Sequence, residues 1–328
     1  MNNASSPMYP LLSTGASTSL AVCFVLIAIF SILFNAILIT VILSEKKLHT
    51  MTNIYIINLA IGDLLTAIAV VPFDADYMFK QNFPYDKIPC GIKEILFMVS
   101  LPSSIINLLL LTCERFVSVY FPFEETRYFS KRIVFLSISL SWIYSMNVGF
   151  YPIYKDGISA IIIKDKRCYM EFSPAFAYYH IIVNFTIPVL IIAGLNIFLF
   201  TVAHKHQKEI LKMVINNSQK CSFHGNVKAA KTILMLFGNF FVCWIIYILI
   251  ATSHLSCHQD NCLPKELPWV SNVINYLSIV LNPFIYGLLN TCIRKAILKN
   301  IHKVLNLFCK SQQIKCIKET DLHLIAPS

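Results

Sequence analysis

The chain has 328 residues, of which 56% are hydrophobic and only 13% are charged. Soluble proteins of this size carry about 25% charged residues, so the low share indicates that lipid surrounds much of the chain. With nine glycines, no glycine-rich phosphate loop and no metalloprotease motif, no enzyme is expected. The net charge of +10 does not predict nucleic-acid binding, because no soluble domain with a basic, aromatic face remains.

Residues 1–16 are polar, lack lysine and arginine, and contain the sequon Asn3-Ala4-Ser5. No basic region precedes the first apolar run, so a cleaved signal peptide is not expected. We therefore expect an extracellular N-terminus with Asn3 as a glycosylation site.

Seven long apolar runs follow the polar start, and each is long enough to cross a bilayer as a helix. In the second run we expect Asp63 at mid-depth and a kink at Pro72. The runs cover about residues 17–44, 53–79, 90–123, 133–154, 175–202, 229–252 and 267–290.

Positive charge is distributed unevenly between the loops. Of the 27 lysines and arginines, 19 fall in segments expected inside and 8 in segments expected outside. Such an excess is typical of the cytoplasmic side. Seven crossings from an outside start also end inside. Both cues predict a multi-pass membrane protein with its N-terminus outside and its C-terminus in the cytoplasm.

Basic and apolar residues alternate after the last run. Arg294, Lys295, Lys299 and Lys303 have the spacing of an amphipathic helix that lies on membrane lipid. The predicted fold is an all-α membrane protein, a seven-transmembrane helix bundle plus a C-terminal amphipathic surface helix. Its parts are the N-terminus 1–16, the bundle 17–290, the surface helix 291–308 and the cytoplasmic tail 309–328.

Four of the eleven cysteines, Cys90, Cys168, Cys257 and Cys262, fall in or beside the expected outer loops. An even number of cysteines in an oxidising compartment favours disulfides. Pairing Cys90 with Cys168 would tie the third span to the long outer loop, and pairing Cys257 with Cys262 would staple the last outer loop. The alternative is that these thiols are unpaired.

Several motifs occur in order, one set in each span. They are Asn35, Leu59-Ala60-x-x-Asp63, Cys90, Glu114-Arg115-Phe116, Trp142, Pro188, Phe240-x-x-Cys243-Trp244 and Asn282-Pro283-x-x-Tyr286. Together they resemble the rhodopsin-like (class A) family of G-protein-coupled receptors over nearly the whole chain. Shorter segments, such as Ala69-Val70-Val71-Pro72-Phe73 and Cys168-x-x-Glu171-Phe172, are most similar to the amine, adenosine and melatonin branch.

The resemblance implies a cell-surface receptor that binds an extracellular ligand, activates a heterotrimeric G protein and binds arrestin. Glu114, Arg115 and Phe116 would face the G protein, and Arg115 would pair with Glu114 in the inactive state. Pro283 and Tyr286 would form an activation switch in the seventh span.

Three positions depart from the family's pattern. Asn226 stands where many relatives carry a second acid opposite Arg115, so we expect a loose inactive lock and appreciable basal signalling. Asn196 replaces the tyrosine partner of Tyr286. Ile246 replaces a proline, so we expect a less kinked sixth span.

Asp63, Ser104 and Asn282 are polar residues expected at mid-membrane depth, where an unpaired polar group costs several kcal/mol. The resemblance implies that they converge on water and a sodium ion. Ser278-Ile279 replaces the usual Asn-Ser pair, which weakens the case for sodium. The alternative is a cluster satisfied by water alone.

The resemblance also places a ligand pocket at the outer ends of the spans. Phe97 stands where amine receptors carry an aspartate, Ala251 where adenosine receptors carry an asparagine, and Tyr276 where opsins carry the retinal lysine. An aromatic, uncharged pocket for a small neutral or weakly polar ligand remains. Its expected lining is Phe97, Leu101, Phe172, His180, Asn184, Trp244, Tyr247, Asn272 and Tyr276.

Four acids nearer the surface would suit a basic group or a cationic peptide, namely Asp74, Asp76, Glu94 and Glu171. We favour the alternative that they are solvated or paired with Lys80, Lys93, Lys164 or Lys166. His180 is expected to be a hydrogen-bonded pocket residue, since no second histidine or cysteine stands at metal-ligand spacing. No metal site is predicted.

Cys309 follows the surface helix and resembles the family's palmitoylation site, with Cys316 a weaker candidate. Two other functions stay open: a seven-span binding protein with little or no G-protein signalling, and a peptide receptor. A transporter or channel is disfavoured, because the spans do not repeat and Asp63 is the one charge expected in the core.

Overall fold

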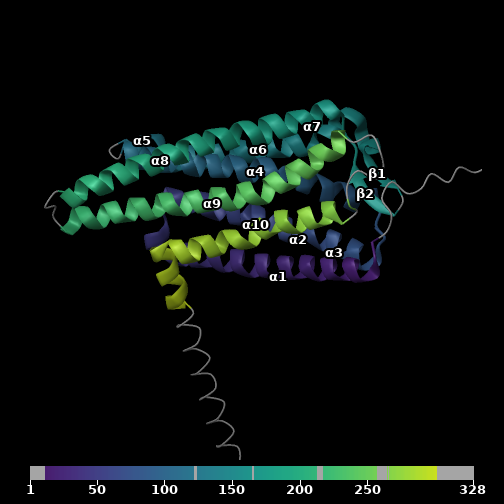
Figure 1. Ribbon diagram of the computed structural model, residues 1–328, viewed down its shortest axis with the longest axis horizontal. Helices are drawn as coiled ribbons and strands as arrows, with labels where there is room; N and C mark the ends of the chain where they lie inside the picture. Colours follow the sequence, from purple (N-terminus) through teal and green to yellow (C-terminus); the bar gives the residue numbers. More distant parts are fainter. Residues whose placement is uncertain are drawn as a thin grey trace, which may run out of the picture.

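The structure is a computed structural model that describes residues 12–121, 124–164, 166–212, 217–256, 264 and 266–300, without the side chains of 125, 126, 203–230, 251 and 254–256. Figure 1 shows a bundle of long helices that lie side by side, with two short strands at one end and α5 at the other. We call these the disulfide end and the Arg115 end, after the residues found there.

All seven expected spans are confirmed as helices long and apolar enough to cross a membrane. The elements before the hairpin are α1 (Thr14–Ser44), η1 (Lys46–Leu48), α2 (Met51–Ala69), α3 (Val71–Lys80), α4 (Lys87–Tyr120), α5 (Glu125–Tyr128), α6 (Lys131–Asp156) and η2 (Gly157–Ala160). After the hairpin come α7 (Pro174–Ile181), the π-helical η3 (Ile182–Thr186), α8 (Ile187–Lys212), α9 (Asn217–Ser256) and α10 (Leu267–Leu289).

Side-chain caps and prolines explain several helix boundaries. The hydroxyls of Ser13, Thr50 and Ser173 accept hydrogen bonds from backbone N–H groups three residues later, as N-cap residues do. The second span breaks at Val70, directly before Pro72, where the sequence predicts a kink. The sixth span, which lacks the proline, runs in α9 without a break from Asn217 to Ser256.

A short antiparallel hairpin covers the disulfide end. Strands β1 (Ile161–Lys164) and β2 (Arg167–Met170) pair with Ile161 opposite Met170 and Lys164 opposite Arg167. The expected disulfide between Cys90 and Cys168 is confirmed and ties β2 to α4. The hairpin itself was not predicted, because four-residue strands in a loop have no clear apolar alternation.

Apolar side chains cover the outside of the bundle, as expected of a surface in lipid. Leu43, Phe135 and Leu190 are each at least 59% exposed. The interior combines apolar residues with buried polar ones, among them Asp63, Asn107 and Asn282. The polar groups therefore face other helices rather than lipid, where they would lack partners.

At the C-terminal end, residues 291–300 are helical, and Lys299 Nζ lies 2.6 Å from Glu45 Oε1 at the end of α1. The continuation of this helix to residue 308 stays a prediction. Asn3, Cys257, Cys262, Cys309 and Cys316 lie outside the described residues, so their expected glycosylation, disulfide and palmitoylation are not tested.

Helices α4 and α6 approach each other closely at Gly149. A Cβ atom there would lie 2.6 Å from Val99 Cγ2 and 2.9 Å from the Ile95 carbonyl oxygen. Such contacts force a shift of the α4 backbone or of its side chains, which typically costs about 1–3 kcal/mol.

We predict that Gly149→Ala lowers the thermal stability of the purified protein by several degrees, measured as the monodisperse fraction left after heating. Gly62→Ala is the matched control, since its Cβ would meet only Trp142 Cη2, at 4.0 Å. Equal stability of the two variants would show that the α4–α6 contact is not tight at Gly149.

Candidate functional site

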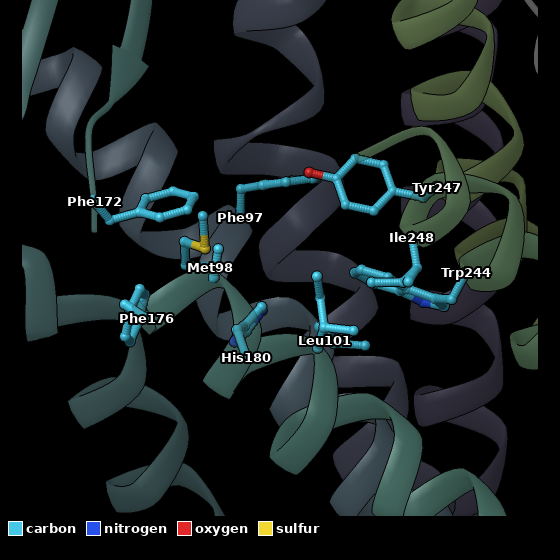
Figure 2. Close-up of a pocket in the computed structure, with 11 residues that line it drawn as sticks. Phe97, Met98, Leu101, Phe172, Phe176, His180, Trp244, Tyr247 and Ile248 are labelled. Atoms are coloured by element: carbon cyan, nitrogen blue, oxygen red, sulfur yellow. The ribbon is translucent and has the colours of Figure 1, made fainter. Parts of the chain in front are cut away.

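A cavity of about 300 Å³ opens near the disulfide end, between α4, α7 and α9. In Figure 2, Phe172, Phe176, Met98 and His180 stand on one side, Trp244, Tyr247 and Ile248 on the other, and Leu101 between them. The full lining is Phe97, Met98, Leu101, Phe172, Phe176, Ala177, His180, Ile181, Trp244, Tyr247 and Ile248. Such a wall suits an apolar or aromatic ligand body.

Six of the nine expected pocket residues line this cavity, and Asn184, Asn272 and Tyr276 do not. Asn184 is turned toward α6, where the Tyr144 hydroxyl donates to its side chain at 2.5 Å. Tyr276 is buried with its hydroxyl bonded to Asp74, and Asn272 is half-buried away from the wall. Met98, Phe176, Ala177, Ile181 and Ile248 were missed, although each lies one, three or four residues from a predicted lining residue on its helix.

Aromatic ring contacts hold the cavity wall in place. The Phe97 ring lies 5.5 Å from Tyr247 and 6.2 Å from Tyr276, both edge-to-face. Trp244 lies 5.8 Å from Tyr247 and 5.8 Å from Phe240 below it. Each such pair adds about 0.5–1.5 kcal/mol beyond the burial of its area, so the rings restrain one another.

Behind this wall lies a buried cluster of charged groups. Lys93 Nζ is 3.0 Å from Asp74 Oδ1 and 2.8 Å from Glu94 Oε1. The Tyr276 hydroxyl donates to Asp74 Oδ2 at 2.8 Å. We refer to Asp74, Lys93 and Glu94 as the ion cluster.

The other two acids near the surface, Asp76 and Glu171, are paired with a lysine or exposed to solvent, which is the alternative favoured from the sequence. Asp76 pairs with Lys80 at 2.8 Å, and Glu171 is exposed. Of the four lysines named as partners, Lys80 and Lys93 form such pairs within the described residues.

A second cavity, of about 410 Å³, lies between the ion cluster and the hairpin. It differs from the first cavity in its charged wall. It is lined by Phe73, Asp74, Tyr77, Phe83, Lys93, Lys164, Arg167, Cys168, Tyr169 and Trp269.

Hydrogen bonds join three spans at mid-depth. Asn282 Nδ2 donates to Asp63 Oδ2 at 3.0 Å, and Asn239 Nδ2 donates to Asn282 Oδ1 at 3.1 Å and to the Ser278 carbonyl at 3.2 Å. Ser104 is half-buried and forms no hydrogen bond to Asp63 or Asn282. Of the three residues expected to converge, Asp63 and Asn282 are therefore bonded to each other, and Asn239 joins them through Asn282.

The sodium ion that the resemblance implies at these atoms stays a prediction. A hard cation needs several oxygen ligands. Here Asp63 Oδ2 and Asn282 Oδ1 each accept from an amide N–H, and Ser104 stays apart from them. No group of three or more His, Cys, Asp or Glu with metal-binding geometry occurs among the described residues.

A further network links α2, α4 and α6. Asn58 Nδ2 donates to Asn107 Oδ1 at 2.8 Å, and Trp142 Nε1 donates to Asn58 Oδ1 at 2.9 Å. Asn107 Nδ2 continues to the Tyr55 carbonyl at 3.0 Å. Sequence reasoning found Trp142 but missed both asparagines, whose only signal is an amide within an apolar run.

At the Arg115 end, Arg115 and Glu114 form a two-point ion pair. Arg115 Nε lies 2.7 Å from Glu114 Oε2, and Nη2 donates to Oε1 at 2.9 Å. The Thr52 hydroxyl donates to the same Oε1 at 2.9 Å. Phe116 packs against Phe198 at 5.3 Å between ring centroids. This is the pairing expected of an inactive state.

The predicted switch residues lie nearby on α10. Pro283 is inside the helix, and Tyr286 is buried with a hydroxyl that has no hydrogen-bond partner in the structure. Asn196 donates instead to the Ile192 carbonyl of its own helix at 2.9 Å. A cavity of about 300 Å³ opens here, with Arg115, Tyr286 and Asn290 in its wall.

Named relatives have similar sequences over most of the chain. An octopamine receptor beta-2R of Chilo suppressalis is 22% identical, with 87% of this chain and 80% of the relative covered. The human histamine H2 receptor is 24% identical, with 88% and 80% covered. An alpha-1A adrenergic receptor of Oryzias latipes is 23% identical, with 90% and 69% covered.

The fold is that of a solved structure. The crystal structure of squid rhodopsin superposes with a TM-score of 0.80 at 19% identity, covering 93% of this chain and 92% of that one. The family model described as "7 transmembrane receptor (rhodopsin family)" matches residues 34–286. The resemblance seen in the motifs is thus confirmed, and the protein is a receptor rather than an enzyme: the chain belongs to the rhodopsin family of seven-transmembrane receptors.

Proposed function

We propose that this protein is a cell-surface receptor that binds a small extracellular ligand in the cavity at the disulfide end and activates a heterotrimeric G protein at the Arg115 end. A disulfide is typical of an oxidising compartment, which supports an outward-facing disulfide end. The excess of positive charge in the loops of the other end supports a cytoplasmic position.

The observation that carries this proposal is the arrangement of a ligand-sized cavity and a charged Arg115 pair at opposite ends of one helix bundle. Trp244 lines the cavity, and Asn239 on the same helix bonds Asn282 at mid-depth. Tyr286 lies one turn beyond Asn282 on α10, toward Arg115. A ligand that contacts Trp244 would thus act on the helices that border Arg115.

The mechanism is a shift between two arrangements of the bundle. A ligand changes the population only through its different affinity for the two states. Contacts in the cavity would favour an arrangement in which the inner end of α9 moves away from Arg115 and frees it from Glu114. Arrestin would bind the same exposed end, and Arg294 and Lys295 would face anionic lipid, at about 1 kcal/mol per charge.

The cavity supports a small ligand with an apolar body. Its volume of about 300 Å³ lies at the lower end for small-molecule pockets and leaves little room for a peptide. The relatives' names refer to octopamine, histamine and adrenergic ligands, all of which are small. The ligand proposed for this chain is of similar size.

A second candidate is a seven-span binding protein that signals weakly or not at all. It is supported by the buried Tyr286 hydroxyl, which has no hydrogen-bond partner among the described residues, and by Ile246 in place of the sixth-span proline. Both features alter parts of the family's activation switch.

We predict that Arg115→Ala abolishes G-protein activation while surface expression is retained, because it removes the group that meets the G protein. The measurement is agonist-stimulated and basal nucleotide exchange in membranes. Arg127→Ala, an exposed arginine on α5, is the matched control and should keep full activity. Unchanged exchange in Arg115→Ala would favour the binding protein that does not signal.

We also predict basal signalling above that of cells without the receptor, because Asn226 does not supply a second acid for Arg115. Asn226→Glu should lower basal second-messenger output, and Asn226→Gln, of the same length but neutral, should leave it unchanged. Equal second-messenger output from cells with and without the receptor, at matched surface expression of the variants, would show that the missing second acid does not weaken the inactive state.

A further inference from the structure

We propose that Glu94, backed by Asp74, is the counter-ion for a protonated amine on this receptor's ligand. It would replace the carboxylate that is absent at Phe97. This inference rests on the proposed function, since it names the chemical class of the small ligand.

Glu94 occupies the cavity-facing side of α4. Phe97, Met98 and Leu101 line the cavity, and Glu94 precedes them by three, four and seven residues. Residues at this spacing share one face of a helix. With a rise of 1.5 Å per residue, Glu94 lies roughly 4.5 Å farther along the axis than Phe97. It is therefore the next side chain outward from the apolar wall.

The ion cluster carries more negative than positive charge. One ammonium group, on Lys93, contacts both Asp74 and Glu94. The remaining oxygen of Asp74 accepts from Tyr276. The remaining oxygen of Glu94 receives no hydrogen bond from the described part of the chain. One negative charge and one acceptor are thus left at Glu94.

Burial makes this unbalanced charge selective for a cation. Glu94 is 9% exposed and Asp74 is 2% exposed. At a given distance, a charge pair in a poorly solvated site interacts several-fold more strongly than in water. Because one lysine is shared by two carboxylates, a second cation beside Glu94 would neutralise the remaining negative charge, and the ion-pair geometry has to offset the desolvation of that cation.

Two more cations border the second cavity, on the hairpin side of the cluster. Lys164 is exposed, and Arg167 hydrogen-bonds Tyr77. Neither lies within ion-pair distance of Glu94, whose cationic contact is Lys93. Tyr247, in the wall of the first cavity, is within electrostatic reach of Glu94, Asp74 and Lys93, so the ion cluster adjoins the first cavity as well as the second.

Aromatic rings complete the environment that an ammonium group requires. Phe97 lies 5.5 Å from Tyr247 and 6.2 Å from Tyr276, and Tyr276 bonds the ion cluster through Asp74. Ring faces attract cations within about 6 Å of the ring centroid. A ligand with its ring in the apolar cavity and its ammonium group one helical turn nearer the disulfide end would contact both the aromatic rings and the Glu94 carboxylate.

The experiment measures binding of defined probes to the purified receptor in lipid nanodiscs, without a G protein. The probes are 4-phenylbutylamine, its neutral counterpart 4-phenylbutan-1-ol, and the shorter 2-phenylethylamine. We expect the long amine to bind at least tenfold more tightly than the alcohol, and more tightly than the short amine, which does not span the extra turn.

Two variants give opposite expected changes. Glu94→Gln should weaken amine binding at least tenfold and leave alcohol binding unchanged, and Glu94→Asp should retain most of the amine affinity. Lys93→Gln should strengthen amine binding, since it uncovers a second carboxylate. Glu171→Gln, at an exposed acid directly after strand β2, is the matched control and should change neither affinity.

The inference is overturned if amine and alcohol bind equally, if no amine binds, or if Glu94→Gln and Lys93→Gln weaken both probes alike, as a purely structural cluster would. Arg115-dependent nucleotide exchange is measured separately. Signalling that persists without amine binding would refute the counter-ion while the receptor function stands.

Discussion

A polar group without a partner is costly in the hydrocarbon interior of a membrane, and this constraint governs where the polar side chains of the bundle lie. Asp63 is bonded by Asn282, Asn58 by Asn107 and Trp142, and Glu114 by Arg115 and Thr52. Each pair joins different helices or holds a charge near the membrane boundary. The polar residues thus connect spans that apolar packing alone would position less specifically.

The same constraint separates the tasks along α4. The turn nearest the disulfide end carries Lys93 and Glu94, the next turns carry the apolar cavity wall from Phe97 to Leu101, and the Arg115 end carries Glu114 and Arg115. Charge is confined to both ends, where partners or water are in reach. With Phe97 in the middle, the cavity wall stays apolar, and the ion cluster lies one turn nearer the disulfide end.

Much of the fold followed from the sequence. Length and hydropathy predict seven spans, Pro72 predicts the break at Val70, and Cys90 with Cys168 forms the expected disulfide. These features depend on local composition and on chain topology. The hairpin β1–β2 was missed, since it depends on pairing between loop residues. Six of the nine pocket residues that the resemblance implied line the cavity, but Asn184 and Tyr276 are bonded elsewhere, to Tyr144 and Asp74.

The sequence by itself determined the class of protein, because apolar length, charge asymmetry and one motif in each span are properties of the chain. Only the tertiary structure decided which polar groups meet. It separated Ser104 from Asp63, brought Asn239 to Asn282, and placed a single lysine between Asp74 and Glu94. Hydrogen bonds and ion pairs form at about 3 Å. Helix rotation and tilt set such distances, and neither can be read from the order of residues.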